Sequence, residues 1–244
     1  METTAGEIAK KLNKHYYDLQ VDITTHLYIV GSVGRNTAIK NSSDLDLLFD
    51  LPTSVYSRFN NYESNGQSAL LQEVKTILAE RYPKTKMSAD GQVVVIEFTN
   101  YTVELVPAFL QTDDRFKYPD THDGGSWKYT DPLKEQSEGV SCNDKSNGKY
   151  FDFCHLIRAW KNEIGFRFGG LLIDTLIYNH FKENDYFVEQ EDYYDIFKSV
   201  LEYLKARNKE QAYWLAVGSN QQVYNSNNGI FVAGCKAGVF GYRK

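Results

Sequence analysis

A glycine-serine turn followed by a pair of aspartates is the feature that most constrains how this chain folds. Gly31-Ser32 directly follows an apolar run, and Asp44 and Asp46 begin a second apolar run. Glycine lets a backbone approach a phosphate closely, and serine adds a hydroxyl donor. Because side chains alternate along a strand, the two aspartates share one face. Paired carboxylates on a rigid face are typical ligands of an oxygen-coordinated Mg²⁺.

A third carboxylate is predicted on a later hairpin. Residues 93–98 and 102–107 have the composition of two strands joined by a tight turn. Alternation places Glu104 on the side opposite Val103 and Leu105. A carboxylate among so many apolar residues is costly to bury unless a cation or another partner compensates its charge. We therefore expect Glu104 to face the same metal site as the two aspartates.

Each part of this pattern has a simpler explanation when it occurs alone. An isolated Asp-x-Asp is usually a solvated strand face, an isolated Gly-Ser is a turn, and an isolated Glu in a strand is usually exposed at an edge. The order and spacing together favour a functional site. A strand, a Gly-Ser turn, a short helix over residues 33–40, an Asp-x-Asp strand and a later carboxylate form a specific combination.

The segment GSVGRNTAIKNSSDLDLLFDLP at 31–52 resembles the polymerase-β-like nucleotidyltransferase superfamily. Within it, the chain is similar to the cGAS/DncV-like nucleotidyltransferases of bacterial antiphage defence, the CBASS oligonucleotide cyclases. Further similar motifs cover nearly the whole chain. They are VELVPAF at 103–109, WKYTDP at 127–132, LIRAWKNEIG and GGLLIDTLIYN within 156–179, and GSNQQVY at 218–224.

This resemblance implies an α+β fold with two lobes: a polymerase-β-like nucleotidyltransferase core, with a mixed sheet and flanking helices, and a C-terminal helical lobe. A chain of 244 residues is long enough for both. We place the catalytic core at residues 1–145, with a spine helix over 4–19, and the helical lobe at 146–244. Residues 111–149 form a long polar stretch without clear periodicity, which we interpret as a lid or product-binding surface, or as an ordered crossing between lobes.

The helix predicted over residues 150–164 carries two cations, Arg158 and Lys161, on one face. The residues alone leave open whether this is a solvated cationic face or a site for a triphosphate. The resemblance favours the triphosphate, because the family's lysine on this helix contacts it. It also adds Ser219 to the nucleotide-binding candidates. Where related enzymes carry a phosphate-contacting serine this chain has Gly169-Gly170, so that contact is absent or comes from backbone amides.

The resemblance implies nucleotidyl transfer, in which a ribose hydroxyl attacks the α-phosphate of a nucleoside triphosphate and pyrophosphate leaves. Asp44 and Asp46 are expected to bind two Mg²⁺ ions, with Mn²⁺ as the alternative, and Glu104 to bind the metal that activates the hydroxyl. Gly31 and Ser32 are expected to hold the β- and γ-phosphates. Closure of the product into a cyclic di- or oligonucleotide second messenger is implied by the resemblance alone.

Net charge and composition limit the kinds of partner that this protein is expected to bind. A formal net charge of −5 argues against an enzyme that grips long DNA or RNA, since such proteins usually carry a basic excess. Nucleoside triphosphates, ATP among them, need only Mg²⁺ and a few local cations. The widely spaced Cys142, Cys154 and Cys235 encode no zinc module and are typical of reduced thiols. Without a signal peptide or a long apolar run, we expect a cytoplasmic protein that does not interact with membranes.

No effector domain is visible in the sequence, so the resemblance implies a separately encoded effector that senses the product. Two other functions stay open. A minimal nucleotidyltransferase would transfer a nucleotide onto RNA or a protein, and the helical-lobe motifs argue against it. A catalytically silent nucleotide-binding module is disfavoured because all three carboxylates are present.

Overall fold

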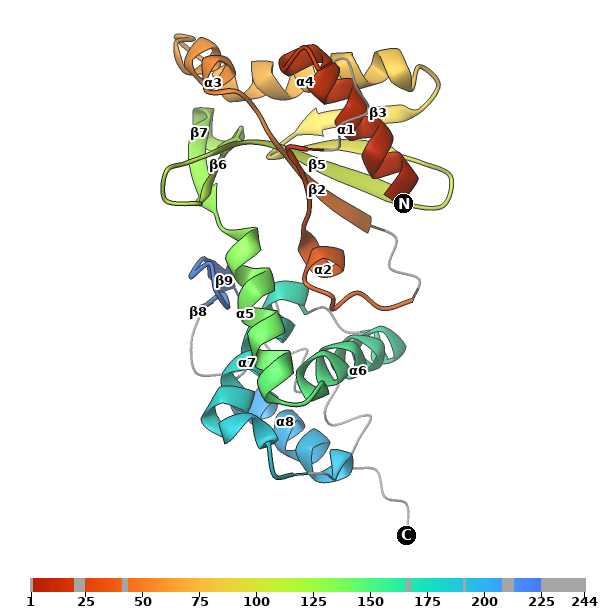
Figure 1. Cartoon of the computed structure of the whole chain (residues 1–244), viewed down its shortest axis with the longest axis vertical. Helices are drawn as coiled ribbons and strands as arrows, with labels where there is room; N and C mark the ends of the chain where they lie inside the picture. Colours follow the sequence, from red (N-terminus) through yellow and green to blue (C-terminus); the bar gives the residue numbers. More distant parts are fainter. Residues whose placement is uncertain are drawn as a thin grey trace. The chain divides into compact units, whose positions relative to one another are not determined.

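The computed structural model describes residues 2–19, 25–40, 44–165, 168–190, 192–207 and 213–224 (Figure 1). The chain forms two compact units. The first comprises residues 1–34 and 42–131, and the second comprises residues 35–41 and 132–244. The first unit is built on a seven-stranded sheet, whereas the second consists of helices and a small hairpin. This architecture confirms the predicted α+β class.

The first unit alternates helices with strands of a mixed sheet. Its helices are α1 (Glu2–Tyr16), α2 (Gly31–Gly34), α3 (Thr53–Asn60) and α4 (Gly66–Arg81), and a 3₁₀ turn spans His122–Gly124. Its strands are β1 (Leu27–Ile29), β2 (Asp44–Asp50), β3 (Lys86–Asp90), β4 (Val93–Glu97), β5 (Thr102–Leu110), β6 (Phe116–Asp120) and β7 (Ser126–Thr130).

The order of the main strands is β1-β2-β5-β4-β3, and β6 joins β5 to β7. Among the strands of the described residues, β2 and β5 pair in parallel and the other pairs in this sheet are antiparallel. Parallel neighbours need a crossover connection, and α3, α4 and the β3–β4 hairpin supply it. The antiparallel pairing of β4 with β5 confirms the hairpin predicted over residues 93–107.

One face of this sheet packs against helices. In Figure 1, α1 and α4 lie along the same side of the sheet. Ile8 and Leu12, one turn apart on α1, are fully buried. Alternate residues of β2 and β5 point to the same core, and the set that packs there includes Leu45, Leu47, Phe49, Val103 and Leu105. Alternation therefore sends the intervening side chains to the opposite face.

The opposite face carries a second, smaller apolar cluster. It contains Val30, Leu48, Ala108 and Phe116, with Val106 packed against it. Leu48 has the same strand parity as Asp44 and Asp46, and Val106 and Ala108 have the parity of Glu104. The acidic side chains therefore share a face with apolar neighbours.

The polar stretch 111–149 is regular throughout much of its length, which the sequence pattern did not indicate. It contains β6, β7 and the helix α5 (Pro132–Lys145). The four buried residues of α5 recur at helical spacing but are Pro132, Glu135, Gly139 and Cys142, none of them a large aliphatic residue. A helical period in such residue types leaves no apolar stripe for sequence analysis to find.

The second unit packs α5 with three further helices. They are α6 (Lys149–Ile164), α7 (Gly170–Glu183) and α8 (Tyr193–Arg207), followed by the hairpin of β8 (Tyr213–Leu215) and β9 (Gln222–Tyr224). Phe153 and Ile157 of α6 are fully buried in the core that α7 and α8 complete. The helix α6 is capped by Gly165, whose left-handed backbone (φ 75°) lets its N–H donate to the Lys161 carbonyl at 2.9 Å.

The two compact units divide at residues 131–132, whereas the sequence analysis places the start of the helical lobe at residue 146. The difference is α5, whose buried residues pack with the second unit. Residues 35–41 also group with the second unit, although they lie between two elements of the first. Sequence neighbours of the Gly-Ser turn thus belong to a different body from the turn itself.

Two expectations from composition concern thiols and membranes. Cys142 and Cys154 are buried and unpaired, and Cys235 lies outside the described residues. Burial raises the pKa of Cys142 to about 12, so this thiol stays protonated at neutral pH. Within the described part of the chain, no helix has both the length and the apolar character needed to cross a bilayer.

Candidate active site

The parallel pairing of β2 with β5 places the predicted carboxylates on one face. Asp46 lies directly beside Glu104 in the strand register, and Asp44 lies beside Thr102. Paired strands are about 4.8 Å apart, so neighbouring side chains on the same face are close. The odd-numbered neighbours Leu45 and Leu105 are buried on the helix-covered side. The three carboxylates therefore leave the sheet together, on its other face.

The pKa of Glu104 shows that its carboxylate interacts electrostatically with those of Asp46 and Asp44. Burial raises the pKa of Glu104, and the negative charges of Asp46 and then Asp44 raise it further. Glu104 and Asp46 are partly buried, while Asp44 is exposed. Three like charges in one partly desolvated patch form a site that favours binding of a cation or a proton.

The carboxylates suit Mg²⁺ without forming a closed cage. Among the described residues, no three His, Cys, Asp or Glu side chains are grouped as a metal site. Mg²⁺ does not require one, because it usually takes one or two carboxylates and completes its shell with water and substrate phosphates. The all-oxygen donor set and the raised pKa of Glu104 therefore fit a hard divalent cation.

Gly31 packs against the carboxylate of Asp46. A Cβ atom added to Gly31 would lie 1.7 Å from Oδ2 of Asp46 and 2.5 Å from its Cγ. The backbone of Gly31 is also left-handed, with φ 61°. The N–H of Val30 donates to the Asp46 carbonyl at 2.9 Å, which ties the turn to β2. Only glycine fits here, and its absence of a side chain brings the turn to the acidic strand.

Ser32 lies within α2, directly after Gly31. The predicted helix over 33–40 is wrong: α2 spans Gly31–Gly34, and the residues after it are not helical. Asn36 has a left-handed backbone, with φ 57°, which ends a helix in the way that glycine commonly does. Ser32 is thus carried on a single helical turn, directly after the glycine that packs against Asp46.

Lys161 lies near the C-terminal end of α6 in the second unit, partly buried. Burial, and then the neighbouring Arg158 cation, lower the pKa of Lys161. Within the described residues no carboxylate forms an ion pair with its ammonium group. A partly desolvated ammonium beside another cation gains from binding an anion, as expected for a phosphate contact.

The other two candidates of the second unit are engaged inside the protein. Nη2 of Arg158 donates to both carboxylate oxygens of Asp174, each at 2.7 Å. The hydroxyl of Ser219 donates to Oε1 of Glu135 at 2.7 Å. Sequence analysis missed both acidic partners, because an acidic residue on a helix is usually exposed and nothing nearby in the chain signals its burial.

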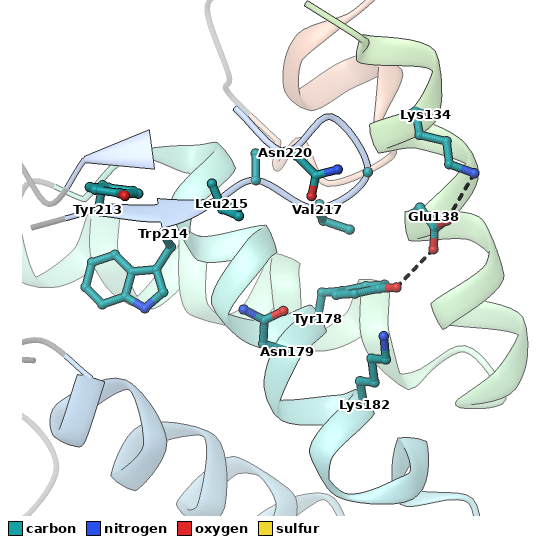
Figure 2. Close-up of a pocket in the computed structure, with 12 residues that line it drawn as sticks. Lys134, Glu138, Tyr178, Asn179, Lys182, Tyr213, Trp214, Leu215, Val217 and Asn220 are labelled. Carbon is teal, nitrogen blue, oxygen red and sulfur yellow. Dashed lines mark hydrogen bonds and ion pairs between the residues drawn. The ribbon is translucent and has the colours of Figure 1, made fainter. Parts of the chain in front are cut away.

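A separate pocket of about 810 Å³ lies in the second unit between α5, α7 and β8. Figure 2 shows Lys134 and Tyr178 reaching Glu138 from opposite sides. Nζ of Lys134 lies 3.2 Å from Oε1 of Glu138, and the Tyr178 hydroxyl donates to Oε2 at 2.9 Å. Lys182 of α7 and Asn220 line the same pocket. None of the predicted site residues lines it, so the pocket is distinct from the carboxylate face.

Comparison with known proteins identifies the family. Residues 1–143 match the family model of the Second Messenger Oligonucleotide or Dinucleotide Synthetase domain, SMODS. This match covers more than half of the chain and includes the Gly-Ser turn and all three carboxylates. No match was found among curated proteins.

Solved structures show the same fold at low sequence identity. A CdnE cyclic dinucleotide synthase from Elizabethkingia meningoseptica, solved with GTP and Apcpp, is 14% identical, with a TM-score of 0.69 over 96% of this chain and 90% of that one. A CdnE c-UMP-AMP synthase from Rhodothermus marinus, solved with Apcpp and Upnpp, is 16% identical, with a TM-score of 0.60 over 96% and 89%. A STING-associated CdnE c-di-GMP synthase from Capnocytophaga granulosa is 16% identical, with a TM-score of 0.66 over 96% and 79%.

The matched family model and the shared fold agree with the motifs read along the sequence. The Gly-Ser turn and the acidic pair lie on a strand, a short helix and a following strand, in the order that the sequence predicted. This chain therefore belongs to the Second Messenger Oligonucleotide or Dinucleotide Synthetase (SMODS) domain family, and it shares the fold of the solved CdnE synthases.

Proposed function

We propose that this protein joins nucleoside triphosphates into a cyclic di- or oligonucleotide second messenger for bacterial antiphage defence, with release of pyrophosphate. Family membership supports the reaction class. The observation that carries the proposal is the carboxylate face, on which Asp46 and Glu104 are register partners and Gly31 packs against Asp46.

Asp44, Asp46 and Glu104 are the proposed ligands of the divalent cation, with Mg²⁺ favoured over Mn²⁺. When bound, the metal would neutralise phosphate charge and lower the pKa of the attacking ribose hydroxyl. The chain's own contribution is a fixed acidic face. The β2–β5 pairing sets the separation of the ligand strands, and the turn at Gly31 limits where the Asp46 carboxylate can rotate.

Gly31 and Ser32 are the proposed phosphate contacts of the first unit. The Ser32 hydroxyl and nearby backbone N–H groups would donate to the β- and γ-phosphate oxygens. Lys161 would add a cation that donates to the same triphosphate, because its ammonium is partly buried and lacks an acidic partner in the described part of the chain. Arg158 and Ser219 are proposed to act indirectly, since both donate to buried carboxylates.

The proposed substrates are free nucleoside triphosphates, ATP among them. The two CdnE structures solved with Apcpp, and with GTP or Upnpp, are consistent with this choice. A net charge of −5 disfavours long nucleic acid as a substrate. We place the enzyme in the cytoplasm, where these substrates occur, and expect a separately encoded effector to sense the product.

The chemical identity of the reaction product tests this proposal. Purified protein would be incubated with Mg²⁺ and all four nucleoside triphosphates, one of them α-³²P-labelled in each reaction, and then treated with phosphatase. We expect a small labelled product that resists phosphatase, pyrophosphate in the supernatant, and a cyclic mass by mass spectrometry. Label that appears only on added tRNA or on protein would instead establish transfer onto a macromolecule and overturn cyclisation.

A further inference from the structure

The second unit contains a buried cluster of charged and hydroxyl side chains that holds the segment after the Gly-Ser turn. Its members come from four separate parts of the chain and are at most 11% exposed at their side chains. Arg35 and Thr37 follow α2, and the partners are Glu135 of α5, Arg158 of α6 and Asp174 of α7.

Asp174 is the centre of this cluster and is completely buried. Its Oδ2 accepts hydrogen bonds from Nε of Arg35 at 3.0 Å and from the hydroxyl of Thr37 at 3.0 Å. Arg158 donates to the same oxygen at 2.7 Å, and also donates to the Thr37 hydroxyl at 3.1 Å. Three groups from two distant segments therefore converge on one carboxylate.

Arg35 connects Asp174 to a second carboxylate. Its Nη1 donates to Oε2 of Glu135 at 3.1 Å, and the other oxygen of Glu135 accepts the Ser219 hydroxyl. Burial alone would lower the pKa of Arg35, but the charges of Asp174 and Glu135 outweigh it and the net pKa is raised. The cluster thus contains two guanidinium groups and two carboxyl groups.

This cluster is an inefficient way to stabilise a fold. Buried ion pairs often stabilise a protein no more than apolar residues of the same volume would, because each charge loses its hydration. Here Nε of Arg158 is also buried without a hydrogen-bond partner in the described part of the chain. Leaving such a donor unsatisfied destabilises the folded protein. Holding its side chains in fixed positions is therefore a better explanation for this cluster than a contribution to the stability of the fold.

The cluster is close in sequence to the proposed phosphate contacts. Arg35 follows Ser32 by three residues, and α2 ends at Gly34, directly before Arg35. On α6, Arg158 precedes Lys161 by three residues, which is about one helical turn. Few residues therefore separate each anchored side chain from its proposed phosphate contact.

We propose that Thr37, Arg35 and Asp174 are positioning residues for nucleotidyl transfer, which act through the backbone of α2 to orient Ser32. Arg158 extends the same role to Lys161. This proposal rests on the function proposed above, since it assigns a consequence to the position of the phosphate contacts. It predicts that loosening the cluster slows turnover more than it weakens substrate binding or stability.

The test compares Thr37→Val with Thr37→Ser. Valine keeps the shape and removes the hydroxyl, while serine keeps the hydroxyl and removes a methyl group. Asp174 retains both arginine partners in either variant, so both should fold. Ser199→Ala is the matched control, because it removes another hydroxyl of the second unit, one bonded to His180 at 2.8 Å.

We expect Thr37→Val to lower kcat by about 10- to 100-fold, in line with the cost of misplacing reacting groups by an ångström, with KM changed less than about threefold. Thr37→Ser and Ser199→Ala should stay within about threefold of wild type in kcat. The proposal is overturned if Thr37→Ser is impaired as much as Thr37→Val, since packing and not hydrogen bonding would then matter.

Hydrogen–deuterium exchange of the peptide that covers α2 provides a readout independent of catalysis. We expect Thr37→Val to accelerate exchange of the α2 amides by about tenfold, and the serine and Ser199 variants to leave it unchanged. Unchanged α2 exchange in Thr37→Val would overturn the proposal even if turnover fell. If the wild-type protein makes no product, but Thr37→Val still accelerates exchange of the α2 amides, the proposed function is refuted and the anchoring role is retained.

Discussion

Replacing Gly31 with alanine tests how closely the Gly-Ser turn and the acidic strand depend on each other. The added Cβ would lie 1.7 Å from Oδ2 of Asp46 and 2.7 Å from its Cβ. No real Cβ tolerates either distance, so the Asp46 side chain must rotate away or the turn must retreat. Both movements separate the proposed metal ligand from the proposed phosphate contact.

The expected magnitudes differ for stability and for activity. A non-glycine residue at φ 61° costs about 1–2 kcal/mol, which corresponds to a fall of about 2–8 °C in melting temperature for a chain of this size. Displacing a ligand by an ångström costs about 100-fold in rate. We therefore expect Gly31→Ala to fold and to lose at least about 100-fold in pyrophosphate release.

Gly91→Ala is the matched control for this substitution. Gly91 has nearly the same backbone, with φ 64°, and its added Cβ would meet the His122 ring, at 3.3 Å from Cε1 and 3.9 Å from Nε2. It carries the same left-handed strain without touching a carboxylate. We expect a similar fall in melting temperature and turnover within about threefold of wild type.

The assay is pyrophosphate release with saturating Mg²⁺ and nucleoside triphosphates, alongside thermal unfolding of each variant. Equal losses of activity in the two alanine variants would attribute the effect to backbone strain alone. Wild-type turnover in folded Gly31→Ala would refute the close coupling of the turn to Asp46.

Three further predictions follow from the charges of the described residues. Glu104→Gln should abolish turnover yet raise the melting temperature of metal-free protein by about 1–3 °C, since it removes repulsion at a partly exposed site. The folded state holds the Glu104 proton more tightly than the unfolded chain does, so the stability of the wild type should fall as the pH rises through the raised pKa of Glu104. Thermal unfolding over a series of pH values should show a shallower fall in Glu104→Gln. Lys161→Met should lower kcat/KM by about 10- to 100-fold through loss of one charged phosphate contact, and unchanged steady-state kinetics would exclude that contact. Burial lowers the pKa of His180 to about 4, so its share of the stability should be lost as pH falls from about 6.5 towards 4, and denaturant unfolding of His180→Gln should show a weaker acid dependence than wild type.

The core of the candidate site could be predicted because its signals are local and periodic. Leu45 and Leu47 alternate with the aspartates, and Val103 and Leu105 flank Glu104, so the strand period alone assigns the faces. The parallel pairing that sets Asp46 beside Glu104 could not be derived from either strand. The structure supplies it, through the register of β2 with β5.

Other elements were hidden because their patterns are weak. The strand β3 alternates between exposed and half-buried residues, and α5 buries Glu135 and Gly139 in place of aliphatic residues. The Asp174 cluster was hidden for another reason. Arg35 and Asp174 are 139 residues apart in the chain, and no local pattern distinguishes a buried aspartate from an exposed one.

The measurement that tests the central claim most directly is pyrophosphate release by the Asp44→Asn, Asp46→Asn double variant. The two substitutions keep the shape of the side chains and remove the charges that the carboxylate face depends on. We expect folded protein, with a melting temperature at or above that of wild type, and no pyrophosphate above background with any nucleoside triphosphate and Mg²⁺. Turnover near the wild-type rate would contradict the assignment of the acidic face as the catalytic site.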